Sequence, residues 1–298
     1  MRQFFIFFAL AFVAPIAPFV VGEALSQPVV REKKPEGHLT LTARLMLGGE
    51  SIHDGLFWYV YNATLGENDR LLLVASQAGG EGVFDLDSGS YVVAVSFGHA
   101  RAMRRVEIKD GQSLHEDFNL NAGAINLDAV LVNGHINEKQ LSFSLYKDDR
   151  ANDETGLIMD NIKPRSLVRL AAGTYHVVSY YGASNAIASS NIQVSAGKIA
   201  QMTLQHQAAQ ITLKLVRRAG GEAIADTSWS IADSYGDIIY ETAGAYASLI
   251  LAEGDYVVTA RNKDLIYQKE FSVSSGQDKN VDVISDPENG DLLDDSVD

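Results

Sequence analysis

The sequence predicts an all-β protein in which an N-terminal signal peptide precedes three tandem antiparallel β-sandwich repeats. Three observations predict this fold: an apolar run at the start of the chain, one phrase that recurs three times, and a two-residue alternation of apolar and polar side chains within each copy. Beyond the first 26 residues, no stretch keeps the i, i+3, i+4, i+7 spacing of apolar residues that a long helix requires.

The N-terminal segment has the pattern of an export signal. Arg2 supplies a positive charge, residues 4–21 form an apolar run of 18 residues, and small residues that suit a signal peptidase follow. We therefore interpret residues 1–26 as a signal peptide. The alternative is an uncleaved anchor, through which the chain would contact the membrane, but Pro15 and Pro18 weaken a spanning helix.

The composition narrows the classes of function. Of the 298 residues, 46% are apolar and 21% are charged, which is typical of a globular protein. The formal net charge of −14 repels phosphate, so we expect no nucleic-acid partner. The chain has no cysteine, which excludes disulfides, thiolate metal sites and cysteine nucleophiles, and we expect no cofactor. Export without disulfides indicates a bacterial envelope protein, so we predict a periplasmic or secreted location.

The phrase Leu-x-x-Gly-x-Tyr occurs three times and sets the repeat period, with its tyrosines 84 and 81 residues apart. Aligned apolar positions extend each copy to about 85 residues, and the joints lack the composition of a flexible linker. Domains of this size bury a lower fraction of their surface than larger domains do, so we expect neighbouring repeats to pack against each other. The predicted repeats cover residues 37–121, 122–207 and 208–285.

Within each repeat the apolar residues follow a period of two. Residues 38–45 alternate apolar with polar or small side chains, which predicts a strand that is buried on one face. Turn residues at regular spacing predict about seven strands per repeat and favour a sandwich. In the first repeat the further runs lie near residues 56–61, 71–75, 83–86, 91–97, 103–108 and 116–120.

The recurring phrase has a structural interpretation. Its leucine ends one strand, its glycine is expected to adopt the positive φ of a tight reversal, and its tyrosine begins the next strand. A tyrosine at such a corner buries its ring and returns its hydroxyl to a nearby backbone group. We therefore assign Tyr91, Tyr175 and Tyr256 to a structural corner, and not to catalysis.

In each repeat the recurring phrase is followed by a strand and then by a closing turn, at Gly111, Gly197 or Gly276. In these features the chain resembles the carboxypeptidase-regulatory-like or transthyretin-like bacterial repeats. The resemblance covers nearly all of residues 37–285 and implies prealbumin-type, Ig-like sandwiches. It also implies non-catalytic modules that serve as stalks, spacers, or sugar- or protein-binding units, because the peptidase activity in the family's name belongs to a separate domain.

Charged segments flank the repeats. Residues 27–36 are interpreted as a charged spacer. Residues 286–298 hold six acidic residues and no basic one, which predicts a disordered, solvating tail.

The candidate chemical sites are weak, and we expect no catalytic or metal-binding residue. None of the seven histidines has the spacing of a metal pair. Ser195 and Lys198 match Ser-x-x-Lys, but they are expected to straddle a hairpin turn and not to lie one helical turn apart. The acid-rich segment 148–154 forms a candidate calcium loop, although Arg150 favours the alternative, a solvated loop.

The loops after the tyrosine strands are the predicted interaction sites, because loops on a rigid sandwich commonly carry recognition. We weigh recognition of an anionic partner by the basic cluster of the first repeat against neutralisation of acids on an adjoining repeat, and favour neutralisation. The candidate residues are His99, Arg101, Arg104 and Arg105 in the first repeat and Tyr180, Tyr181 and Asn185 in the second.

The sequence therefore predicts an exported, non-catalytic scaffold of the cell envelope that binds another envelope protein or a glycan through its repeat loops. The alternative is a carbohydrate- or small-ligand-binding module, and a hydrolase with a site at a repeat junction is the least favoured. Sugar sites need exposed aromatic faces in a concave patch. Trp58 and Trp229 are expected at buried strand positions, which favours the scaffold.

Overall fold

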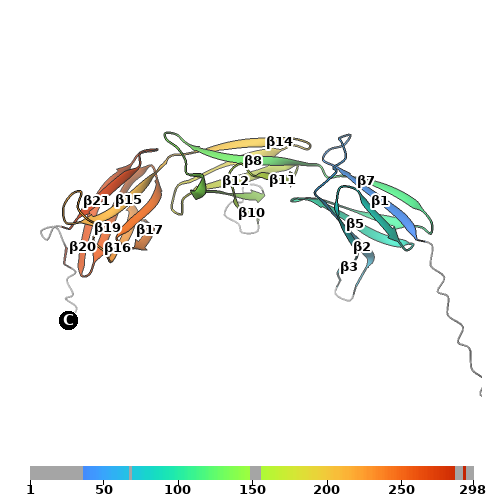
Figure 1. Ribbon diagram of the computed structural model, residues 1–298, viewed down its shortest axis with the longest axis horizontal. Coiled ribbons are helices and arrows are strands. Elements are labelled where there is room, and N and C mark those ends of the chain that lie inside the picture. The colour runs from blue at the N-terminus through green and yellow to red at the C-terminus, as the bar shows by residue number, and fades with distance from the viewer. Residues whose placement is uncertain (1–35, 67–68, 148–155, 286–290, 293–298) are drawn as a thin grey trace, which may run out of the picture. The chain divides into compact units, whose positions relative to one another are not determined.

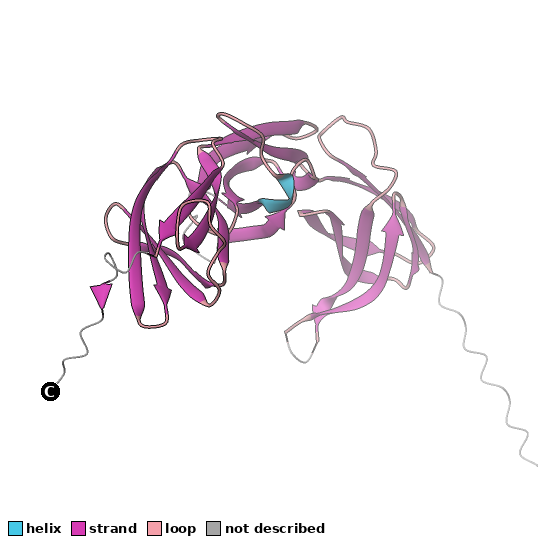
Figure 2. Ribbon diagram, turned by 60° about the vertical axis from the view of Figure 1, so that its left-hand side comes forward, coloured by secondary structure: helices cyan, strands magenta, loops and turns pink. Residues whose placement is uncertain are grey.

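The computed structural model describes residues 36–66, 69–147, 156–285 and 291–292. Strands make up nearly all the regular structure in these ranges, together with one three-residue 3-10 turn, η1 (Glu138–Gln140), and the predicted all-β class is confirmed (Figure 2). The predicted signal peptide, nearly all of the spacer and the calcium candidate lie outside the described residues. Within the described ranges, no helix is long and apolar enough to cross a membrane.

The first repeat is a sandwich of two sheets. The three-stranded sheet has the order β4-β1-β7 and the four-stranded sheet has the order β3-β2-β5-β6. Alternate side chains of β1 and β2 are buried, as the period of two predicts. The strands are β1 (Gly37–Arg44), β2 (Leu56–Leu65), β3 (Leu71–Gly79), β4 (Gly82–Leu86), β5 (Gly89–Phe97), β6 (Ala100–Ile108) and β7 (Ser113–Asn119).

The second repeat has the same two-layer arrangement. Its sheets have the orders β11-β8-β14 and β10-β9-β12-β13, and Figure 1 shows β8 and β14 in one layer with β10 and β12 in the other. The strands are β8 (Ala122–Leu131), β9 (Leu141–Lys147), β10 (Leu157–Ile162), β11 (Leu167–Ala171), β12 (Gly173–Tyr181), β13 (Ile187–Val194) and β14 (Ile199–His206).

The third repeat differs by one added strand. Its sheets have the orders β18-β15-β21 and β17-β16-β19-β20-β22. The added β22 (Asp291–Leu292) lies in the tail that was expected to be disordered, and it pairs with Leu265 and Ile266, so that expectation does not hold for these two residues. The others are β15 (Ala208–Val216), β16 (Thr227–Asp233), β17 (Ile238–Ala243), β18 (Tyr246–Ala252), β19 (Gly254–Asn262), β20 (Leu265–Val273) and β21 (Lys279–Ile284).

The pairing is otherwise antiparallel, as predicted, but the first and last strands of each repeat pair in parallel, which the sequence did not predict. The last strand follows a strand of the other sheet and crosses to the three-stranded sheet. A parallel neighbour requires such a crossover and cannot be reached by a hairpin.

Each repeat encloses its own apolar core. The expected burial of the two tryptophans is confirmed: Trp58 is 0% exposed and Trp229 is 2% exposed. Each indole N–H donates to a glycine carbonyl, that of Gly80 or Gly244, over 2.9 Å. Phe143 takes the equivalent buried position in the second repeat. The large ring thus fills the centre of the sandwich while its polar group is satisfied at the edge.

The glycine of the recurring phrase does not have its expected conformation in the first two repeats. Left-handed φ occurs at neither Gly89 nor Gly173. The ring of the following tyrosine lies against the glycine instead, and a Cβ atom built on Gly89 would be 3.7 Å from Tyr91 Cε2. The reversal between β4 and β5 is therefore made without a left-handed residue at this position.

Candidate interaction surface

The outer face of the four-stranded sheet in the first repeat carries a groove. Three aromatic residues of β2, Phe57, Tyr59 and Tyr61, lie on this face because the alternate residues of the strand point into the core. The register pairs them through β5 with residues of β6, which gives three rows across the sheet. The rows are Phe57–Ser96–Arg101, Tyr59–Ala94–Met103 and Tyr61–Val92–Arg105.

The groove follows β5, because the residues in the middle of the rows are smaller than those on either side. It has a volume of about 510 Å³, and its lining includes Tyr59, Tyr61, Arg101 and Met103. The rings of Tyr59 and Tyr61 stack, with centroids 6.3 Å apart and planes 23° apart. Met103 is 64% exposed. One wall is therefore aromatic, and the other combines a thioether with a guanidinium group.

This arrangement can bind a flat or extended ligand. Tyrosine rings offer apolar faces together with hydroxyl groups, the methionine adapts its shape, and arginine pairs with carboxylate or phosphate. The corresponding faces of the other two repeats lack this combination: the rows through β9 and β16 begin with Ser142, Ser144 and Tyr146, and with Ser228, Ser230 and Ala232.

The predicted basic cluster is divided between two environments. Arg101 lines the groove. Arg104 points to another side of the strand, where its Nη1 lies 2.6 Å from Glu116 Oε2 and its guanidinium carbon lies 4.9 Å from the Phe118 ring centroid. Arg105 Nη2 donates to the Ala63 carbonyl over 3.5 Å. The acid that neutralises Arg104 thus belongs to the same repeat, which corrects the expectation of a partner on an adjoining repeat.

These arginines lie on β6, and not in a loop as expected. Gly98 has a left-handed φ of 62°, so Gly98 and His99 alone close the hairpin between β5 and β6. Glycine at the first position of a two-residue turn matches the twist of the flanking strands. The chain therefore returns to strand conformation at Ala100, before the basic cluster begins.

His99 lies at the junction between the first two repeats. Its backbone N–H donates to the Arg169 carbonyl in β11 over 3.0 Å. Arg169 also places its guanidinium carbon 4.4 Å from the centroid of the Phe97 ring. A Cβ atom on Gly98 would come within 2.9 Å of Arg169 Cβ, so the turn fits closely against the strand of the next repeat.

The predicted residues of the second repeat also lie elsewhere than expected. Tyr180 and Tyr181 belong to β12, not to a loop. Tyr181 is buried in the core, and its hydroxyl accepts from the backbone N–H of Asn137 over 3.2 Å. Tyr180 faces outward beside Tyr146, and burial raises its pKa, as does its hydrogen bond with Tyr146.

Asn185 does lie in a loop, and that loop docks on the third repeat. Its side-chain oxygen accepts from the backbone N–H of Ala252 over 3.0 Å, and its amide nitrogen donates to Tyr256 Oη over 2.9 Å. A Cβ atom on Gly182 would lie 2.9 Å from Ile250 Cβ, and Ile250 packs into the core of the second repeat. Asn185 thus connects two repeats.

The two junctions repeat one contact. Arg169 and Ile250 each precede the leucine of the recurring phrase, so they occupy equivalent positions in β11 and β18. Each meets a glycine, Gly98 or Gly182, that has a left-handed φ in the β5–β6 or β12–β13 turn of the preceding repeat. The same turn-on-strand contact therefore joins the first repeat to the second and the second to the third.

A second contact supports each junction. The loop after β1 meets the turn before β14, where a Cβ atom on Gly197 would lie 2.5 Å from Met46 Sδ. At the next junction the loop after β8 meets the turn before β21, and a side chain on Gly276 would collide with the Asn133 backbone. Both turn glycines have a left-handed φ, of 73° and 72°.

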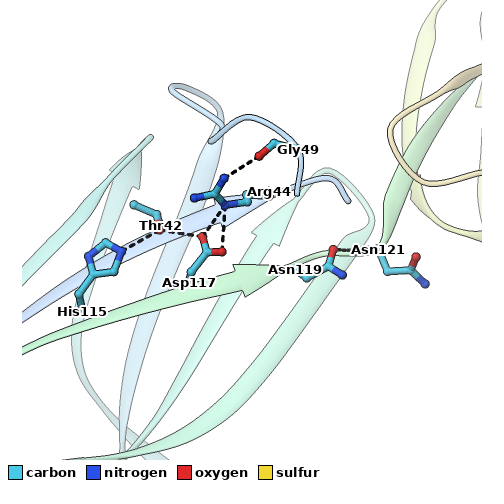
Figure 3. A network of polar contacts seen from close by, with 7 residues as sticks. All are labelled: Thr42, Arg44, Gly49, His115, Asp117, Asn119 and Asn121. Atoms are coloured by element: carbon cyan, nitrogen blue, oxygen red, sulfur yellow. Dashed lines mark hydrogen bonds and ion pairs between the residues drawn. The ribbon is translucent and has the colours of Figure 1, made fainter. Parts of the chain in front are cut away.

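A polar network holds the first of these loops in place (Figure 3). Asp117 in β7 accepts from Arg44 Nε over 2.9 Å and from Thr42 Oγ1 over 2.8 Å. Arg44 Nη1 in turn donates to the Gly49 carbonyl over 2.7 Å. The loop that receives the second repeat is thereby fixed from β1 and β7.

The corner tyrosines share one geometry. The hydroxyls of Tyr91, Tyr175 and Tyr256 donate to the carbonyl four residues earlier, over 2.8, 2.8 and 2.9 Å. Burial raises the pKa of all three hydroxyls, so they remain protonated donors at neutral pH.

Comparison with known proteins identifies one repeat. Residues 210–285 match the model of the Rhizobiales growth-associated tandem repeat domain. This segment covers most of β15 and all of β16 to β21, which is the third repeat. The match supports the tandem-repeat part of the predicted resemblance, and not its carboxypeptidase-regulatory-like part. No curated protein matches the chain.

Several solved structures are similar to this chain, with low TM-scores and low sequence identities. The Bacillus anthracis TIE protein is 15% identical over 84% of this chain and 50% of its own, with a TM-score of 0.24. A streptococcal ancillary pilin is 11% identical over 85% of this chain and 99% of its own, with a TM-score of 0.31. BcpA, the major pilin subunit of Bacillus cereus, is 9% identical over 84% of this chain and 100% of its own, with a TM-score of 0.24. The chain thus spans half the length of the first of these, and no function is carried over from them.

Sequence reasoning missed the aromatic wall of the groove. Phe57, Tyr59 and Tyr61 stand at alternate positions around the tryptophan that was expected to be buried. Three aromatic side chains on the solvent face of a half-buried strand are a usable signal, because that face is ordinarily polar. Met103 gives no comparable signal in the sequence, because a single methionine beside a cluster of arginines does not indicate on which face of the strand it lies.

Proposed function

We propose that this protein is an exported, non-catalytic scaffold of the bacterial cell envelope, and that it binds its partner in the groove of the first repeat. The observation that carries this proposal is the groove itself, in which Tyr59, Tyr61 and Met103 leave apolar surface exposed beside Arg101. Exposed aromatic, methionine and arginine side chains are enriched where proteins bind one another. The signal-like pattern of residues 1–26 supports export.

The repeated junction supports the scaffold role. The turn-on-strand contacts at Gly98 and Gly182 fix successive repeats to each other through close backbone packing. The groove therefore lies on a chain of repeats that pack against one another. Junction side chains such as Asn185 and Arg169 are engaged in these contacts, which gives a hydrolytic site at a repeat junction no support.

The test is affinity capture from an envelope extract with three forms of the tagged protein. The groove variant carries Tyr59→Ser and Tyr61→Ser, and the matched control carries Tyr235→Ser, whose side chain is 90% exposed in the third repeat. A partner that is retained by the wild type and by the control, but lost with the groove variant, supports the proposal. Equal capture by all three forms contradicts it.

Carbohydrate binding is the second candidate function. It is favoured by the stacked faces of Tyr59 and Tyr61, since sugar rings pack on exposed aromatic faces and an acidic sugar would pair with Arg101. A glycan panel tests this directly with the same three proteins. Binding of an acidic glycan that disappears in the groove variant assigns the groove to carbohydrate, whereas capture of an envelope protein without glycan binding assigns it to protein.

A further inference from the structure

We propose that the occupant of the groove in the first repeat is an extended polypeptide segment that presents two acidic side chains four residues apart, with an apolar side chain midway between them. This inference rests on the proposed function, because it names the ligand of the same groove. It follows from the register of the sheet, which determines the side chains that an extended ligand would meet along β5.

The groove offers three successive positions along its floor. The outward residues of β5 are Val92, Ala94 and Ser96, and each lies in a row between an aromatic side chain of β2 and a longer side chain of β6. Successive rows are two residues apart, which is about 6.6 Å at the rise of a β-strand. The side chains on one face of an extended polypeptide have the same spacing. Such a ligand can therefore place one side chain in every row.

The width of the groove favours a single extended chain over a helix. The walls, β2 and β6, lie on either side of β5, so their axes are about 10 Å apart. The side chains of the two walls narrow this space further. An α-helix with its side chains is about 10–12 Å across, which is too wide to reach the floor.

The two outer rows are basic, and the middle row is apolar. Arg101 and Arg105 belong to the outer rows on β6, and their Cα atoms are about 13 Å apart along the strand. The middle row between them combines Tyr59 with Met103, which is 64% exposed. Arginine pairs with carboxylates, whereas the thioether and the ring receive an apolar side chain. The rows thus fit an anion, an apolar group and a second anion, in that order.

The charge of this face supports an acidic ligand. The three rows cross four strands and contain two arginines and no acidic residue, although the net charge of the chain is −14. The Arg101 side chain is exposed, and within the described ranges it makes no hydrogen bond or ion pair. Arg105 reaches the Ala63 carbonyl, and Glu107 is the next outward residue of β6. Arg101 is therefore the stronger of the two anchors.

A polypeptide fits these rows better than an acidic glycan does. A chain of sugar acids has a carboxylate on every ring and no apolar side chain to place against Met103. An extended polypeptide supplies an acidic, an apolar and a second acidic side chain on one face, at the spacing of the rows.

The test is the binding of labelled peptides to the full chain, measured by fluorescence anisotropy up to about 1 mM. The matched peptide is Ser-Asp-Ser-Leu-Ser-Asp-Ser. The shifted peptide, Ser-Asp-Asp-Leu-Ser-Ser-Ser, has the same composition, but its acids are adjacent and reach only one arginine. We expect the matched peptide to bind about tenfold more tightly. Equal affinities, or no binding of the matched peptide, would overturn the proposal.

Charge reversal in the protein identifies the rows. Arg101→Glu should weaken binding of the matched peptide by more than about tenfold. The control Arg218→Glu makes the same change at an exposed position of the third repeat and should have no effect. The double variant Arg101→Glu/Arg105→Glu should bind Ser-Lys-Ser-Leu-Ser-Lys-Ser more tightly than the wild type does. The proposal fails if this preference is not reversed, or if the control loses the matched peptide as well.

Two further measurements separate this inference from its alternatives. An oligouronate that binds the wild type but not Arg101→Glu, without binding of the matched peptide, would assign the groove to a glycan and overturn the proposal. Envelope capture that survives in the Tyr59→Ser/Tyr61→Ser variant contradicts the proposed function and this inference with it. Capture that is lost in that variant, together with equal binding of the matched and shifted peptides, overturns this inference alone.

Discussion

The side-chain amide of Asn185 in the second repeat donates a hydrogen bond to the hydroxyl of Tyr256 in the third, with the nitrogen and oxygen 2.9 Å apart. The Asn185 oxygen accepts from the N–H of Ala252, and Tyr256 donates to the carbonyl of the same residue. One side chain thus attaches the loop of one repeat to the corner of the next. The corner is therefore part of the junction as well as of its own sandwich.

Replacement of Asn185 by alanine should loosen this junction. The N–H of Ala252 loses its acceptor, and a partly buried group left unpaired costs about 1–3 kcal/mol. We expect urea unfolding to show a lower midpoint and a broader transition, because the third repeat becomes less coupled to the second. The control Asn280→Ala removes the same side chain from an exposed position on β21 and should leave the transition unchanged. Identical curves for both variants would exclude a junction role for Asn185.

The corner tyrosine should contribute through both its ring and its hydroxyl. Tyr175 is 8% exposed and donates to the Ala171 carbonyl over 2.8 Å. Tyr175→Phe keeps the ring and should lower the free energy of unfolding by about 1 kcal/mol. Tyr175→Ala also leaves a cavity and should cost about 3–5 kcal/mol. Chemical denaturation of both variants measures the difference, and an unchanged stability for Tyr175→Ala would refute the corner assignment.

The sequence predicted what depends on local pattern, and it missed what depends on register. The recurring phrase and the period of two identified the strands, the buried tryptophans and the corner tyrosines. Tyr59 and Met103, by contrast, are 44 residues apart and meet only because both pair with Ala94. Alternation fixes the face of a strand on which a side chain lies, but not which residue lies across from it.

The displaced loop residues have a similar cause. The sequence predicts a loop that extends through the basic cluster, but Gly98 allows the turn between β5 and β6 to close in two residues. The docking role of Asn185 depends on the position of the following repeat, which no local pattern contains. Parallel pairing of the first and last strands was missed for the same reason, since it joins residues about 75 apart.

Stability should fall in mild acid because of His206. This histidine is 2% exposed, and its Nε2 lies 2.8 Å from Ser179 Oγ. Burial lowers its pKa from the ordinary value of 6.5, which the unfolded chain recovers. Below that value the unfolded state binds more protons than the folded state, so the free energy of unfolding decreases as the pH falls, by at most about 1.4 kcal/mol per pH unit for one proton.

Melting temperatures measured from neutral to mildly acidic pH test this expectation. His206→Gln should be less stable at neutral pH but should show a shallower decline toward acid. His53→Gln alters an exposed histidine and should retain the slope of the wild type. A decline that is equally steep in His206→Gln would assign the acid sensitivity to other groups.

The arginines of β6 should separate into one that binds and one that stabilises. Arg101 lines the groove, so Arg101→Ser should weaken retention of an anionic partner about tenfold, with little change in melting. Arg104 is engaged with Glu116 and the Phe118 ring, so Arg104→Ser should leave capture intact and lower the free energy of unfolding by about 1 kcal/mol. Both variants remove one positive charge from the same strand, and each is therefore the control for the other. Of the two, only Arg101 lines the groove. Equal losses of capture in the two variants would therefore mean that the partner responds to net charge and not to the groove.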